Sequence, residues 1–311
     1  MRIVEYDDLD PLSALNLSLL ALDFPLTPEH AAHIRRTDPR PFPCLAIYAL
    51  EDDLVLGQVG IFRLPMVSTE GREDVGGIWA VSTHPEHAGR GVASMLMDEA
   101  HARMRAAGLR FSTLGTIRFR TSYRLYRQHG YEDMQVWGTA FAAWDTAHQP
   151  TRLRAEPVVS RGFGFIEQLF ERTADGYLGF AWRHTPFARL RDRVDLEDIR
   201  VLWEHDQPVG YALTRADKSL LVVSDLMLRE EIDAAEAMAA LAANMKASYV
   251  RVALSRPAHM TSLRDAGYRV AHPNWCAFML KPLLPAVTVE GARRLFGIGT
   301  DRFLISWLDT T

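Results

Sequence analysis

The order of predicted elements occurs twice along this chain, and this repetition limits its fold more than any other feature. Each half has two strand-like runs around a polar turn, then an apolar strand, a long helix, a strand, a short helix and a last strand. The first series extends from Cys44 to Ala143, and the second from Arg200 to Lys281. Because the whole series returns once, we expect two similar α/β units in tandem.

The length of the chain agrees with two units. A single hydrophobic core rarely grows beyond about 250–300 residues. This chain has 311 residues, of which 48 % are apolar. The stretch from Thr146 to Arg161 changes character and carries Pro150 and Pro157, as is typical of a linker. We therefore predict a first domain over residues 1–145, a linker over 146–160 and a second domain over 161–311.

Charge and cysteine content exclude several classes of protein. The net charge of −4 comes with no long run of one sign, so a nucleic-acid partner is not expected. Cys44 and Cys276 lie far apart, which supports neither a disulfide framework nor a zinc site. The chain shows no signal-peptide pattern and no stretch of ~20 apolar residues, so we expect a cytoplasmic protein without a membrane partner.

A glycine-bearing loop joins the apolar strand Gly76–Thr83 to a helix that begins near Val92. The first N–H groups of a helix have no partner inside it, and the helix dipole favours negative charge there. Gly89 and Gly91 permit positive φ and a close approach of the backbone. The amides of residues 89–94 could thus cradle a diphosphate, with Arg90 adding charge. The same glycines also fit a plain tight turn.

This loop resembles the acetyl-CoA motif of the GNAT superfamily of N-acetyltransferases, written Q/R-x-x-G-x-G/A. Gly91 fits the glycine and Ala93 the small residue, whereas Ala88 stands where the family has glutamine or arginine. That departure removes a side-chain contact and leaves the backbone cradle. Downstream, Tyr123–Glu132 resembles the second motif of the family, a tyrosine followed by three residues, glycine and an aromatic residue. The resemblance covers residues 76–134.

The resemblance implies an α/β (α+β) fold with two tandem acetyltransferase-like domains, each a mixed, mostly antiparallel sheet flanked by helices. It implies acetyl-CoA as acyl donor, and no metal. The backbone at residues 81–83 would pair with the pantetheine arm, although an ordinary sheet ladder is the alternative. The residues that we expect at the cofactor are Val81, Ser82, Thr83, Ala88, Gly89, Arg90, Gly91, Val92, Ala93, Ser94 and Ser122. Ser122, at the start of a short helix, could equally be a plain N-cap.

The resemblance also places Tyr126 beside the thioester sulfur, as general acid to the leaving thiolate. A core tyrosine packed against the sheet is the alternative. Residues 78–81 offer no carboxylate to act as base. His84, Glu86 and His87 lie near the loop, but turns commonly carry such polar residues. We therefore expect water-mediated deprotonation of the amine, or an amine that arrives neutral.

The second half lacks the features of an anion loop. At the corresponding place, Leu228–Glu236 contains no glycine and four carboxylates, which would repel a diphosphate. Arg264–Tyr268 echoes the second motif without its tyrosine. We expect this domain to be a degenerate copy that binds no CoA. The tandem order resembles the enhanced-intracellular-survival type of acetyltransferases, although we expect this chain to be too short for the further C-terminal domain of that type.

Three functions remain open at this point. The first is an N-acetyltransferase that acts on a primary amine of a small molecule or peptide. The second is a non-catalytic acyl-CoA-binding sensor or regulatory protein, and the third is an assembly scaffold. A homodimer is compatible with each. The sequence does not identify the acceptor amine.

Overall fold

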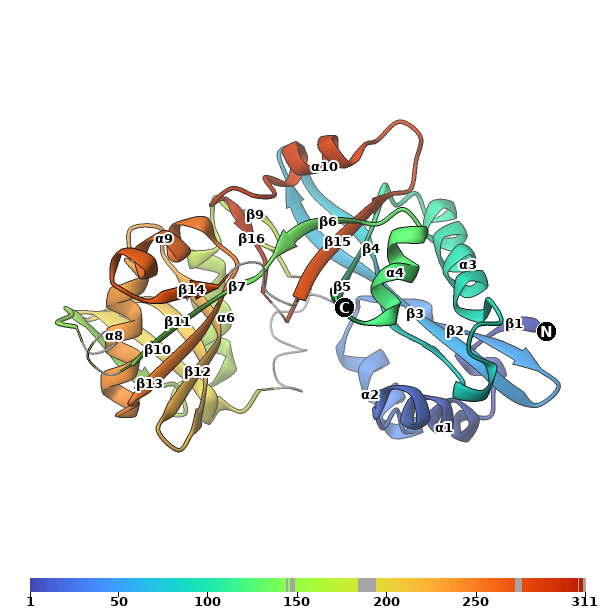
Figure 1. Cartoon of the computed structure of the whole chain (residues 1–311), viewed down its shortest axis with the longest axis horizontal. Helices are drawn as coiled ribbons and strands as arrows, with labels where there is room; N and C mark the ends of the chain where they lie inside the picture. Colours follow the sequence, from blue (N-terminus) through green and yellow to red (C-terminus); the bar gives the residue numbers. More distant parts are fainter. Residues whose placement is uncertain (144, 146–148, 184–193, 272–275, 307, 310–311) are drawn as a thin grey trace.

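Two sheets with helices packed against them form the two lobes of the protein (Figure 1). The computed structural model describes residues 1–311 except 144, 146–148, 184–193, 272–275, 307 and 310–311. Both sheets are mixed and mostly antiparallel, which confirms the expected fold class. Within the described part of the chain, no helix is both long and apolar enough to cross a membrane.

The first sheet has the strand order β1-β2-β3-β4-β5-β15-β6, and in this series only the β4–β5 pair is parallel. Its strands are β1 (Arg2–Glu5), β2 (Pro41–Glu51), β3 (Leu54–Ser68), β4 (Gly71–Thr83), β5 (Phe111–Ile117), β6 (Glu132–Val136) and β15 (Cys276–Pro282). The short strands β9 (Leu178–Gly179) and β16 (Phe303–Leu304) pair with each other, and β9 also joins β3. Together they make a nine-stranded sheet.

Helices cover both faces of the first sheet. They are α1 (Pro11–Leu22), α2 (Pro28–Thr37), α3 (Val92–Ala106) and α4 (Thr121–Gln128). The apolar stripe of α3 packs with α4 on one face of the sheet, and α1 and α2 pack on the other. Asp10 and Thr27 accept hydrogen bonds from the first amides of α1 and α2, and each is followed by proline, as the sequence indicates.

The second sheet repeats this topology. Its order is β8-β10-β11-β12-β13-β7-β14, and its one parallel pair is again the central pair, β12–β13. The strands are β7 (Gly138–Ala143), β8 (Leu153–Pro157), β10 (Ile199–Glu204), β11 (Gln207–Asp217), β12 (Leu220–Leu228), β13 (Tyr249–Leu254) and β14 (Arg269–Ala271). The helices of this half are α6 (Gly162–Thr173), α8 (Ala234–Met245), α9 (Pro257–Asp265) and α10 (Val289–Phe296). Strand β8 thus occupies part of the predicted linker.

The two sheets exchange one strand each. Strand β15 lies between β5 and β6 in the first sheet, and β7 lies between β13 and β14 in the second (Figure 1). The last strand that we predict for the first series, which ends at Ala143, is therefore two strands, β6 and β7, and only Trp137 separates them. The tightest hairpins need two loop residues, so β7 cannot fold back onto β6 and continues into the other lobe. Each half of the chain completes the sheet of the other.

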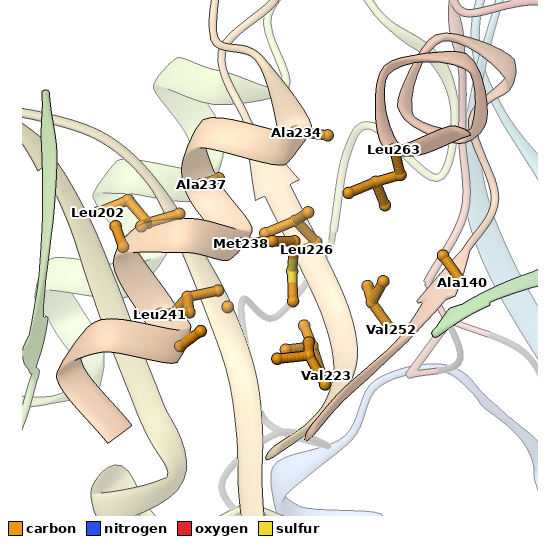
Figure 2. Close-up of a cluster of buried hydrophobic side chains, with 14 of the residues drawn as sticks. Ala140, Leu202, Val223, Leu226, Ala234, Ala237, Met238, Leu241, Val252 and Leu263 are labelled. Carbon is orange, nitrogen blue, oxygen red and sulfur yellow. The ribbon is translucent and has the colours of Figure 1, made fainter. Parts of the chain in front are cut away.

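The exchanged strands are part of both cores. Figure 2 shows α8 lying across the second sheet, with Met238 and Leu241 in one cluster with Ala140 of β7. On the first sheet, Phe278 of β15 packs beside Phe180 and Phe303, and Phe296 of α10 packs against the same sheet. Removal of either exchanged strand would expose the core of the opposite lobe.

Candidate functional site

The parallel strands at the centre of the first sheet separate along their length. Strands β4 and β5 pair only at Gly76↔Ser112 and Gly77↔Thr113. Strand β3 follows β4 as far as Thr83, and β15 follows β5 over its whole length. Among the residues that the structure describes, no strand therefore pairs with the backbone of residues 78–83 on its β5 side. Val81, Ser82 and Thr83 lie along this open edge, and their role at the cofactor stays a prediction.

A β-bulge lies where the two strands part. Trp79 pairs with Gly60 and Ser82 pairs with Gln58, so two residues of β4 oppose Val59 alone. Ala80, inside the bulge, has a φ of 49°, a left-handed conformation that costs a non-glycine residue about 1 kcal/mol or more. A bulge bends and twists its strand. It therefore helps to turn the end of β4 away from β5.

The loop after β4 presents a set of unpaired amides. Gly89 and Gly91 have φ of 78° and 80°, and Gly91 caps α3 without a side-chain hydrogen bond. Among the described residues, none accepts a hydrogen bond from the amides of residues 89–94, and the first bond of α3 runs from Met95 to Gly91. These N–H groups and the positive end of the helix dipole can together hold an anion.

Side chains of the loop contribute less than its backbone. The guanidinium of Arg90 lies 3.2 Å from the carboxylate of Glu51 at the end of β2, and it also bonds His87. The amide of Ala88 donates to the carbonyl of Pro85, inside a short 3-10 turn at Pro85–His87. Contact of Arg90 with a diphosphate would require the Glu51 ion pair to open, whereas the amides at 89–94 are free as they stand.

Tyr126 lies on α4 and faces the first core. Its side chain is 7 % exposed, and its ring meets that of Tyr131 edge-on at 6.1 Å. Burial raises the pKa of Tyr126 to about 12, partly offset by a hydrogen bond with Ser122. The phenol therefore stays protonated at neutral pH. This position agrees both with a proton donor at the edge of the opening and with a core residue.

One polar arrangement near the loop was not predicted from the sequence. The hydroxyl of Ser94 lies 2.7 Å from Nε2 of His129, and Nδ1 of that ring lies 3.3 Å from the carboxylate of Asp98. Ser94 and Asp98 are four residues apart and so share a face of α3, which the sequence could have indicated. His129 ends α4, and only the packing of α4 against α3 brings it there.

The second half has no comparable set of free amides at α8. The carboxylate of Asp233 accepts hydrogen bonds from the amides of Ala235 and Glu236, and the hydroxyl of Ser262 also accepts from Ala235. The helix start is thus closed by its own side chains, as the acidic sequence there predicts. That this domain binds no CoA stays a prediction.

A group of possible metal ligands lies beside the loop. His84, Glu86 and His87 place one ligand atom each within 4.8 Å of one another on the turn before Gly89. Exposed polar turns often have this composition without an ion. The expectation of a metal-free site stays a prediction.

Comparisons with known proteins agree with this geometry. Residues 14–134 match the family model described as acetyltransferase (GNAT) domain. No curated protein matches the chain. A GCN5-related N-acetyltransferase from Anabaena variabilis has a similar structure, with a TM-score of 0.67 and 18 % identity over 91 % of this chain and 73 % of its own.

Two further structures are similar. A probable N-acyltransferase from Enterococcus faecalis has a TM-score of 0.70 and 14 % identity, over 91 % of this chain and 72 % of its own. Eis1 from Mycobacterium abscessus has a TM-score of 0.64 and 14 % identity, over 91 % and 74 %. At these identities the likeness concerns the fold, and it extends over both lobes.

Proposed function

We propose, from the GNAT acetyltransferase domain at residues 14–134, that this protein transfers an acetyl group from acetyl-CoA to a primary amine. The acceptor is a small molecule or a peptide. One observation carries the proposal: the six consecutive amides of residues 89–94 have no hydrogen-bond acceptor in the described part of the chain, and they lie beside the open edge of β4. A plain tight turn does not require an adjacent strand with a free edge.

The unpaired amides and the open edge of β4 fit two different parts of CoA. The diphosphate of CoA would accept hydrogen bonds from the amides at the start of α3. The pantetheine arm carries amide groups of its own, which would pair with the backbone of residues 81–83 as an added strand does. The thioester would then lie in the opening between β4 and β5, near α4.

The chemistry needs little beyond positioning. The amine nitrogen attacks the thioester carbonyl, the C–N bond forms, and the C–S bond breaks as the thiolate leaves. Tyr126 donates its phenolic proton to that thiolate as general acid and then regains a proton from water. The proton lost by the amine goes to water, because residues 78–81 include no carboxylate. Holding both reactants in place removes much of the entropic barrier.

The test is release of free thiol from acetyl-CoA across a panel of aminoglycosides, polyamines, amino acids and peptides. With an accepted amine, Tyr126→Phe should lower kcat by about 10- to 150-fold, the value of one hydrogen bond to a developing charge. Binding of CoA should be unchanged. Tyr131→Phe is the matched control, because Tyr131 is fully buried and bonds Ser112 inside the core.

Two outcomes would count against the proposal. Equal loss of kcat in both variants would mean that Tyr126 acts only through packing. Tight binding of CoA without thiol release for any amine would favour the alternative, a non-catalytic acyl-CoA sensor. The free amides fit that alternative equally well, so thiol release with an accepted amine decides between the two.

A further inference from the structure

The imidazole of His129 contacts the first turn of α3, next to the loop of free amides. It bridges Ser94, in the first turn of α3, and Asp98, one turn later, at 2.7 and 3.3 Å. The side chain of His129 is only 9 % exposed, whereas that of Asp98 is 73 % exposed. Ser94 also supplies one of the six free amides. A titratable ring is therefore one hydrogen bond away from the proposed diphosphate site.

The partners of His129 fix its tautomer. A carboxylate can only accept, so Nδ1 of His129 carries the proton and donates to Asp98. In the neutral ring, Nε2 is then an acceptor, and Ser94 donates its hydroxyl proton to it. In this state the Ser94 proton points at the ring, and it is not available to an anion at the start of α3.

The groups around His129 keep it neutral while the site is empty. Burial is the main cause that lowers its pKa, and Lys281 of β15 lowers it further, whereas Asp98 opposes both. The ring centroid of His101 lies 5.9 Å from that of His129, and Nδ1 of His101 lies 3.3 Å from the ammonium of Lys281. The hydroxyl of Tyr131 lies at hydrogen-bonding distance, 2.9 Å, from Nε2 of His101.

The residues around His129 do not form a favourable site for a metal cation. Asp98, His101 and His129 bring ligand atoms within 4.8 Å of one another. However, both nitrogens of His101 have partners, and the Lys281 ammonium lies 3.3 Å from its Nδ1. A metal ion there would meet a positive charge in a buried site.

We propose that His129 takes up a proton when the CoA diphosphate binds, and that it positions the Ser94 hydroxyl on a phosphate oxygen. This inference rests on the proposed cofactor site. An anion at the start of α3 favours the imidazolium. Nε2 then donates to Ser94, which frees the Ser94 proton for the phosphate. The proton comes from solvent, and no covalent bond changes. His129 is a positioning residue that acts through Ser94.

Proton uptake distinguishes this role from a structural one. Titration calorimetry with CoA near neutral pH, in buffers of different ionisation enthalpy, should show uptake of up to about one proton per CoA. The affinity for CoA should fall as the pH rises. Between the pKa of His129 in the free protein and its pKa in the CoA-bound protein, the fall should be up to about tenfold per pH unit. His129→Gln should still bind CoA, more weakly, with no proton uptake from this site.

Two further variants complete the test. Ser94→Ala should reduce the proton uptake and raise KM for acetyl-CoA with little change in kcat, because the effect is on binding. His30→Gln, on α2 and away from the loop, should behave as the wild type. Equal proton uptake in wild type and His129→Gln, with CoA bound by both, would overturn the role of His129 and leave the cofactor site standing. Failure of the wild type to bind CoA would overturn both.

Discussion

The buried histidine His101 should make the protein sensitive to acid by an amount that follows from its surroundings. His101 is 1 % exposed on α3, and burial lowers its pKa from 6.5 to about 3, with a further contribution from Lys281. Lys281 donates to Nδ1, so the ring proton lies on Nε2 and is donated to Tyr131. A second proton on this ring would have to be accommodated next to an ammonium group in a dry core.

The magnitude follows from proton linkage. Because the folded pKa is depressed, the unfolded chain binds the proton more tightly, so the stabilisation is complete above pH 6.5 and is lost as the pH falls toward 3. Between pH 7 and pH 5 the loss is about 2 kcal/mol for this one histidine, since an unfolded histidine becomes almost fully protonated over that range. This is a substantial part of a typical stability of about 5–15 kcal/mol.

Urea denaturation of the wild type and of His101→Gln at pH 7, 6 and 5 measures this effect. Glutamine retains a donor and an acceptor but does not titrate, so the variant should lose about 2 kcal/mol less than the wild type from pH 7 to pH 5. Burial raises the pKa of Asp225 to about 6, so the stability that this group contributes is lost as the pH rises toward 6. Because both proteins contain Asp225, its contribution cancels in the difference between them. Identical pH dependence of the two proteins would show that His101 is not held neutral.

Two other substitutions test the loop and the C-terminal segment. Gly91→Ala should lower the free energy of unfolding by about 1–2 kcal/mol and weaken CoA binding, because a φ of 80° is strained for alanine although no atom lies in the way. Gly164→Ala in α6, which has open space around it and no positive φ, is the control. Equal melting temperatures of the two variants would contradict the argument. Asp309→Asn should lower the free energy of unfolding, measured by urea denaturation, by about 3–5 kcal/mol, because it breaks the buried ion pair with Arg183 at 2.9 and 3.1 Å. A loss below about 1 kcal/mol would show that another partner compensates.

The conformation of the glycine loop could be predicted from the sequence because its determinants are local. Gly89 and Gly91 adopt the positive φ that glycine permits, and the stripe from Val92 to Met104 forms the predicted helix. At the start of α8, Asp233 closes the helix in the way that the acidic sequence indicates. Each of these features depends on residues within a few positions of one another.

The contacts of His129 with Ser94 and Asp98 could not be predicted, since they join separate elements. Ser94 and Asp98 share a helix face, but nothing in the sequence places His129 between them. Lys281 reaches His101 across 180 positions, because β15 carries it into the first lobe. The tuning of His129 and His101 is therefore a product of packing.

The order of elements, their repetition and the glycine loop follow from the sequence, since helix caps, turns and apolar periodicity are properties of short segments. Which sheet receives β7 and β15 depends on how the two halves pack. A strand pairs through its backbone, which is alike in every strand, so its partner is chosen by geometry. With Trp137 alone between β6 and β7, the chain has no room for a hairpin, and the exchange of strands follows.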